Sequence, residues 1–204
     1  MTGNCANTKE RIFEEAVRLF SENGYPIVPL KDVAKAVHTS ETTIYRHYKN
    51  KADLLNQIIK AFESKLQGYL PTKKQIDRYI ETDTPAQLLQ RCMGRLKDDE
   101  VMMMHRLHRI TYMEQLTNAA ARDLIFGKLH GETAKIIKYT LDKLIEKKSI
   151  PDFDTQFVSV LWAQSLFSDT VRWISDSSAD ASVRAYDMLF ERMMEMVTTG
   201  KIPT

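Results

Sequence analysis

The segment from Leu30 to Lys51, LKDVAKAVHTSETTIYRHYKNK, carries side chains suited to binding a nucleic acid. Its second half contains small hydroxyls, a phenol, a guanidinium and an imidazole, which donate hydrogen bonds to phosphates and base edges. A helix from Glu41 to Tyr48 would turn Ile44 and Tyr48 inward and leave the polar residues exposed. An ordinary polar surface helix is the alternative. We expect a DNA-contacting face made of Ser40, Glu41, Thr42, Thr43, Tyr45, Arg46 and His47, with Lys31 and Lys51 beside it.

Four of these residues are candidates for base edges or nearby phosphates. Arg46 can pair bidentately with guanine, and Glu41 can accept a hydrogen bond from cytosine. The helix dipole also favours a carboxylate at a helix start, so Glu41 has a structural alternative that stays open. Ser40 and Thr42 complete the group.

A second cluster, Met102-Met103-Met104-His105 with His108 one turn further, is rich in methionine. Methionine is adaptable and suits a promiscuous apolar pocket, although ordinary core packing is the alternative. His105 and His108 could share a metal ion, but no third ligand lies nearby in the sequence, so we expect no metal and no cofactor. If helices 86–97 and 100–116 pack antiparallel, they form a pocket for a mainly hydrophobic molecule from Cys92, Met93, Met103, His105, Arg109, Tyr112 and Met113.

The last two expected helices carry an apolar seam. From Val183 to Val197 apolar residues recur at alternating spacings of three and four, which is typical of a helix packed against a partner. The preceding helix alternates large and small residues, which favours close packing. Burial inside a single subunit is the alternative. The candidate seam residues are Leu161, Trp162, Phe167, Val183, Tyr186, Phe190, Met193 and Val197.

Helical periodicity dominates the rest of the chain, and no repeat or strand-like alternation interrupts it. Asn7 with Glu10 resembles a capping box, and Asn23-Gly24 would end the first helix. Asn50 is a good cap for a helix that begins at residue 51. Expected helices therefore span residues 7–23, 30–37, 41–48, 86–97, 100–116, 119–148, 154–174 and 180–198, with a longer one from residue 51 that carries its apolar face as far as Phe62 and a short one within 71–84.

Composition limits the possible classes of protein. The 204 residues hold 29 Lys+Arg against 27 Asp+Glu, and 7 Gly and 6 Pro are too few for a turn-rich β-sandwich. Residues 31–60 hold six basic against three acidic side chains, so the positive excess is local. Two cysteines favour a reducing, cytoplasmic setting. We expect no signal peptide, no membrane span and no enzyme, because the common catalytic motifs are absent.

Residues 8–60 resemble the DNA-binding domain of the tetracycline-repressor (TetR) family. The motifs that carry the resemblance are Leu19-Phe20, Gly24-Tyr25, the helix starting Leu30-Lys31-Asp32-Val33-Ala34, the capping Ser40, and Thr43-Ile44-Tyr45-Arg46-His47-Tyr48 followed by Lys51. Three positions depart from the usual pattern. Pro29 replaces a capping hydroxyl, His38 replaces a glycine in the turn, and Thr39 replaces a small aliphatic residue, so the geometry of the turn is open.

The resemblance implies an all-α protein with a three-helix helix-turn-helix domain over residues 1–50 and a helical ligand-binding and dimerisation domain over 51–204. It implies DNA-backbone contacts for Thr43, Tyr45, His47 and Lys51, and it favours the carboxy-terminal seam as part of a four-helix bundle with a second subunit. The expected protein is a homodimeric transcriptional regulator, released from a palindromic operator by a small hydrophobic ligand. A small-molecule-binding protein with a vestigial DNA-binding head is the alternative.

Overall fold

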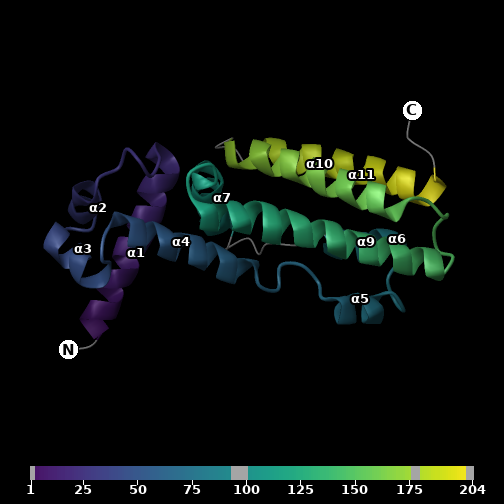
Figure 1. Ribbon diagram of the computed structural model, residues 1–204, viewed down its shortest axis with the longest axis horizontal. Coiled ribbons are helices and arrows are strands. Elements are labelled where there is room, and N and C mark those ends of the chain that lie inside the picture. Colours follow the sequence, from purple (N-terminus) through teal and green to yellow (C-terminus); the bar gives the residue numbers. More distant parts are fainter. Residues whose placement is uncertain (1–2, 93–100, 176–179, 201–204) are drawn as a thin grey trace. The chain divides into compact units, whose positions relative to one another are not determined.

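The computed structural model describes residues 3–92, 101–175 and 180–200, and the side chains of residues 8–92, 101–175 and 190–200. All regular elements in these ranges are helices (Figure 1), which confirms the prediction of an all-α fold. The helices are α1 Gly3–Asn23, α2 Leu30–Ala36, α3 Glu41–His47, α4 Lys51–Leu66, α5 Lys73–Tyr79, α6 Pro85–Cys92, α7 Val101–Glu114, α8 Ala119–Arg122, the π-helix η1 Asp123–His130, α9 Gly131–Glu146, α10 Thr155–Ser175 and α11 Asp180–Thr199.

The chain divides into two compact units. The first comprises residues 1–65 and 99–125, and the second comprises residues 66–98 and 126–204. The first unit is therefore larger than the expected 1–50 domain, because it takes in most of α4 together with α7 and α8. The functional division at residue 50 stays a prediction.

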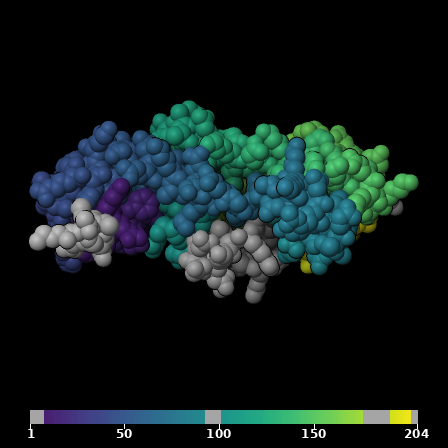
Figure 2. Space-filling view, turned by 90° about the horizontal axis from the view of Figure 1, so that it is seen from below, coloured from purple at the N-terminus to yellow at the C-terminus, as the bar shows by residue number. Residues whose placement is uncertain are grey.

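In the first unit, α1 packs against α2, α3 and α7, and α2 packs against α3. The core is filled from several helices by fully buried side chains, among them Ile12, Phe20, Val33, Ile44, Leu54 and Phe62. Figure 2 shows the residues of α2 to α4, coloured blue, as one continuous stretch of surface. The close packing of these helices follows from the three-to-four spacing of apolar residues in each of them.

The turn between α2 and α3 depends on a residue in the left-handed region. His38 has φ +54°, at the position where the resemblance leads us to expect glycine. Its amide donates to the Lys35 carbonyl, and the Thr39 amide donates to the Ala34 carbonyl at 2.8 Å. These bonds hold the turn in the glycine-type conformation despite the Cβ of His38, whose side chain is exposed.

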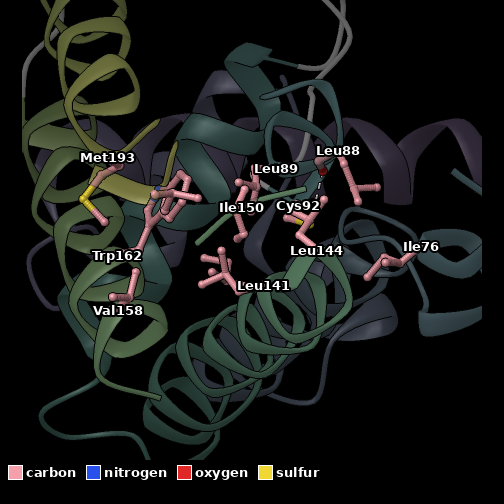
Figure 3. Packing of buried hydrophobic residues seen from close by; sticks show 12 residues of the cluster. Ile76, Leu88, Leu89, Cys92, Leu141, Leu144, Ile150, Val158, Trp162 and Met193 are labelled. Carbon is pink, nitrogen blue, oxygen red and sulfur yellow. Dashed lines mark hydrogen bonds between the residues drawn. The ribbon is translucent and has the colours of Figure 1, made fainter. Parts of the chain in front are cut away.

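In the second unit, α9 packs against α10, α6 and α5, and α10 packs against α11. Figure 3 shows the core, in which Trp162 and Val158 of α10, Leu141 and Leu144 of α9, Leu88, Leu89 and Cys92 of α6, Ile76 of α5, Met193 of α11 and Ile150 meet. No described helix is long and apolar enough to span a membrane.

Two expected helices are wrong in detail. The first begins at Gly3 and not at Asn7. The single helix expected over 119–148 is divided into α8, the π-helix η1 and α9, with Gly127 and Gly131 at or near the junction. Glycine is a poor helix former, so the α-helical ladder is weakest there. Residues 93–97 of the expected 86–97 helix lie outside the described residues.

His38→Gly should stabilise the first unit. Removing the Cβ relieves a left-handed cost of roughly 1–2 kcal/mol, and the flexibility of glycine in the unfolded chain returns part of it, so the expected gain is about 0.5–1 kcal/mol. Urea unfolding measures the change. As a control, Lys35→Gly in α2 should destabilise by about 1 kcal/mol, and an equal loss in both variants would show that position 38 carries no strain.

Candidate DNA-binding site

Two inward side chains hold helix α3 in place. Ile44 and Tyr48 are 0% and 1% exposed, as the sequence predicts. The Tyr48 hydroxyl donates to the Lys9 carbonyl of α1 at 3.3 Å, and the Lys9 ammonium lies 5.7 Å from the Tyr48 ring centroid. Burial raises the pKa of Tyr48 to about 12, so the phenol stays a neutral donor. The rotation of α3 about its axis is therefore fixed by its own buried residues.

The start of α3 is capped as expected. The Ser40 Oγ accepts from the Thr43 amide at 3.2 Å, and the Ser40 and Thr43 hydroxyls lie 3.1 Å apart. Ser40 and Thr43 therefore cap the amino-terminal end of α3, and their remaining hydrogen-bonding capacity faces solvent. Glu41 lies in the first turn of α3, where the dipole favours it, so its structural role is satisfied without DNA.

The remaining polar residues of α3 lie on its outer face. Thr42, Tyr45 and Arg46 are exposed, and Thr43 and His47 are half-buried. Among the described residues, Arg46 makes no hydrogen bond or ion pair. A guanidinium kept in water without a partner on a helix that is fixed in rotation is available for a base or a phosphate. Lys31 of α2 is also exposed.

The start of α4 is capped by two reciprocal bonds. The Asp53 amide donates to Asn50 Oδ1 at 2.8 Å, and the Lys49 amide donates to Asp53 Oδ2 at 2.9 Å. The bond from the Lys49 amide lowers the pKa of Asp53. This arrangement confirms Asn50 as the cap and fixes the position of Lys51, the first residue of α4.

Lys51 has a built environment that the sequence does not predict. Its Nζ lies 4.5 Å from the ring centroid of Tyr25 and 5.7 Å from that of Phe20, and it donates to the Pro26 carbonyl at 3.3 Å. Burial lowers the pKa of Lys51, and the charge of Glu114 on α7 partly opposes this shift. Glu114 is 7% exposed, and its pKa is raised by burial and lowered in part by Lys51.

Comparison with known proteins agrees with this geometry. Residues 12–58 match the family model described as bacterial regulatory proteins, tetR family. The transcriptional regulator AcrR of Shigella flexneri is 37% identical over 59 residues, and the biofilm operon negative transcriptional regulator IcaR of Staphylococcus epidermidis is 35% identical over 51 residues. Residues 12–58 are therefore similar to the DNA-binding segment of tetR-family regulators. The matches cover 29% and 25% of this chain and 27% and 28% of those relatives, so the chain spans about a quarter of their length.

Solved structures extend the likeness to the whole fold. A TerR/AcrR-family regulator from Aquifex aeolicus has a TM-score of 0.60 and 20% identity, covering 93% of this chain and 99% of its own. A transcriptional regulator from Saccharomonospora viridis, solved in complex with choline, has a TM-score of 0.64 and 17% identity over 98% and 100% of the two chains. At these identities the tetR-family likeness outside residues 12–58 is one of fold alone.

The structure divides the residues expected to bind a ligand. Met103, His105, Arg109 and Tyr112 are half-buried on α7, and Met113 of the same helix is 47% exposed. Cys92 belongs to the second unit, where its Sγ lies 3.1 Å from Thr140 Oγ1 and burial raises its pKa to about 11. Met93 lies outside the described residues.

The helices that should form this pocket have their main partners elsewhere. Within its unit α6 packs against α9, and within its unit α7 packs against α1. His108 is 7% exposed and stacks on Phe62 at 4.9 Å between ring centroids, so it is a core histidine of the first unit. In the described part of the chain no three His, Cys, Asp or Glu residues are placed to hold a metal ion. The composition of the pocket stays a prediction.

The expected dimer seam lies largely inside the chain. Trp162, Met193 and Val197 are 0%, 6% and 0% exposed and belong to the core of the second unit (Figure 3). Phe190 packs on Trp162 at 6.2 Å between ring centroids, and Phe167 packs on His130 at 4.1 Å. Trp162, Met193 and Val197 are thus buried within one chain, and an intersubunit contact through Leu161, Phe167 and Phe190 stays a prediction. Val183 and Tyr186 lie outside the described side chains.

A different apolar strip is exposed on α10. Phe157, Val160 and Leu161 are 64%, 42% and 40% exposed, and Val160 and Leu161 lie three and four residues after Phe157, about one helical turn away. Of these three residues, only Leu161 was predicted to lie in an interface. The same three-to-four spacing from Phe157 to Val160 and Leu161 could have identified Phe157 as part of a second apolar face.

Glu114→Gln should lower the pKa of the Lys51 ammonium. The nearby carboxylate favours the charged amine, so removing its charge leaves burial as the main influence. NMR titration of lysine carbons, with Lys51→Arg to assign the signal, measures the shift. Glu10→Gln on the exposed surface of α1, about 20 Å along that helix from Asn23, should leave the Lys51 pKa unchanged. An unchanged value in Glu114→Gln would show that the two charges do not interact.

Proposed function

We propose that this protein is a DNA-binding transcriptional regulator that recognises a palindromic operator as a homodimer and is released by a small, mainly hydrophobic ligand. The observation that carries the proposal is helix α3. Its rotation is fixed by the buried Ile44 and Tyr48, and its outer face presents Thr42, Tyr45 and an unpaired Arg46. A helix of this kind is the element that enters a major groove in helix-turn-helix proteins.

The proposals that this protein represses transcription and responds to a ligand are supported by its relatives and fold neighbours. The Staphylococcus epidermidis relative is a negative regulator, and fold neighbours were solved with choline and with stearoyl-CoA, which are molecules with apolar or cationic parts. Such a regulator would act in the cytoplasm, where its operator lies. We propose residues 1–50 as the DNA-binding domain and residues 51–204 as the ligand-binding and dimerisation domain. No catalytic role is proposed, because the relatives are regulators.

A vestigial DNA-binding head is the second candidate. It is less well supported because the head keeps its caps at Ser40 and Asn50 and the exposed Arg46. A head without function would not need a helix whose polar face is kept free of internal partners. An electrophoretic shift assay with operators selected from a random DNA pool separates the two, since a vestigial head selects no sequence.

Arg46→Ala and Lys51→Ala should weaken DNA binding in different ways. Loss of a base contact through Arg46 should cost roughly 1–3 kcal/mol on the selected operator and little on random DNA. Loss of a phosphate contact through Lys51 should weaken binding on all sequences and reduce the salt slope by about one unit. Titrations at several salt concentrations measure both, with Lys74→Ala on α5 as the control for loss of a positive charge. Parental affinity in both variants would remove α3 and the start of α4 from the DNA interface.

Leu161→Asp should convert a dimer into a monomer. One DNA-binding domain makes few contacts, so a two-fold operator calls for two subunits, and the exposed strip on α10 is an apolar surface suited to a second subunit. A charge placed in such a contact is left unpaired in an apolar environment. Light scattering gives the mass. Gln90→Asp on the exposed surface of α6 should stay dimeric, and a monomeric parent would reject the dimer.

A further inference from the structure

The turn between α1 and α2 forms the surroundings of the Lys51 ammonium. Tyr25 offers its ring face to Nζ at 4.5 Å from the centroid, and Pro26 offers its carbonyl at 3.3 Å. The Phe20 and Tyr25 rings pack edge to face, with centroids 5.3 Å apart and planes at 90°. Phe20 is itself fully buried, so the position of the Tyr25 ring is tied to the core of the head.

The backbone of this turn is also fixed. Gly24 has φ +89°, and its amide donates to the Phe20 carbonyl at 3.0 Å. A Cβ at Gly24 would lie 3.7 Å from the terminal methyl of Met113 on α7, which shows how closely α7 approaches the turn. The turn is thus held between the end of α1 and the end of α7.

An ammonium held in this way keeps donors for another ligand. Lysine has three N–H groups, and the Pro26 carbonyl accepts from one of them. The face of an aromatic ring attracts a cation without occupying a hydrogen bond. The two remaining donors of Lys51 are therefore available to phosphate oxygens, and the usual loss of side-chain entropy on binding is reduced because the rotamer is already set.

We propose that Tyr25 is a positioning residue for DNA binding, whose ring holds the Lys51 ammonium ready for a backbone phosphate. This inference rests on the proposed function. Tyr25 touches Lys51 and acts through it, whereas the residues of α3 contact DNA themselves. The consequence is that part of the sequence-independent affinity is set by a residue outside the recognition helix.

Glu114 joins α7 to this arrangement. It is buried, and its charge acts on both Lys51 and Tyr25. No ion pair joins the Glu114 and Lys51 side chains in the described part of the chain, so the carboxylate acts from beyond contact distance and leaves the ammonium donors free. The aromatic ring, and not the carboxylate, is the direct support of Lys51.

The experiment compares Tyr25→Leu with Tyr25→Phe on the selected operator and on random DNA. Phenylalanine keeps the ring face, so Tyr25→Phe should bind within about twofold of the parent. Tyr25→Leu should bind both DNAs roughly three- to tenfold more weakly, which is the range expected for loss of a partly exposed cation–π contact. In a Lys51→Ala background, Tyr25→Leu should have no further effect on affinity.

This dependence on Lys51 separates positioning from a general structural role. A structural role would weaken binding by the same factor in the Lys51→Ala background and would track the unfolding midpoint of each variant. If Tyr25→Leu does not fold, site-specific replacement of Tyr25 by pentafluorophenylalanine keeps the packing and removes the negative ring face, and it should lower affinity relative to Tyr25→Phe. Equal affinity of these two variants overturns the proposal.

The outcomes also distinguish this proposal from the proposed function. A parent protein that binds neither the selected operator nor random DNA overturns both. A parent that binds the operator while Tyr25→Leu keeps parental affinity and salt dependence overturns only the role of Tyr25. Weakened binding in Tyr25→Leu, rescued in Tyr25→Phe and absent in the Lys51→Ala background, supports the proposal.

Discussion

The anchoring of α3 to α1 through Ile44 and Tyr48 is the constraint on which the rest of the head depends. Both side chains are fully buried, and the Tyr48 hydroxyl donates a hydrogen bond to a backbone carbonyl of α1. A seven-residue helix is too short to be stable by itself, so its orientation comes from this burial. Because two inward residues one turn apart fix the rotation of α3, its polar residues must face outward together.

The start of α4 is likewise fixed in position by a small number of contacts. Capping by Asn50 and Asp53 sets the first turn of the helix, and Tyr25 and Pro26 of a distant turn set the side chain of Lys51. Backbone bonds and a ring face thus position one cation from two parts of the chain. In the proposed DNA interface the exposed guanidinium of α3 would suit bases, and the held ammonium of α4 would suit phosphates.

Local features of the sequence predicted the caps and the inward residues of α3 and α4, whereas the packing partners of the helices in the second unit depend on contacts between distant parts of the sequence. Caps, turns and helical spacing act within a few residues, so Ser40, Asn50 and the inward Ile44 could be recognised directly. The seam containing Trp162 and Met193 has the period of a buried face, but the period does not say whether the burying surface belongs to the same chain or to another. Likewise, no local signal assigns Cys92 and α7 to different units. The glycines at 127 and 131 did carry a signal for the interruption at η1.

The assignment of α7 to the same unit as the head bears on how a ligand could act. Five of the residues expected to bind a ligand lie on α7, the helix whose end carries Glu114 beside Lys51. A ligand can shift an equilibrium only by its difference in affinity between two states. A tenfold loss of operator affinity needs about 1.4 kcal/mol, which is within reach of a change at one charged cluster in a partly buried site. A small displacement of α7 relative to the turn at Gly24 and Tyr25 would change the surroundings of Lys51 directly, so the proposed release by a ligand does not depend on a large rearrangement of α3.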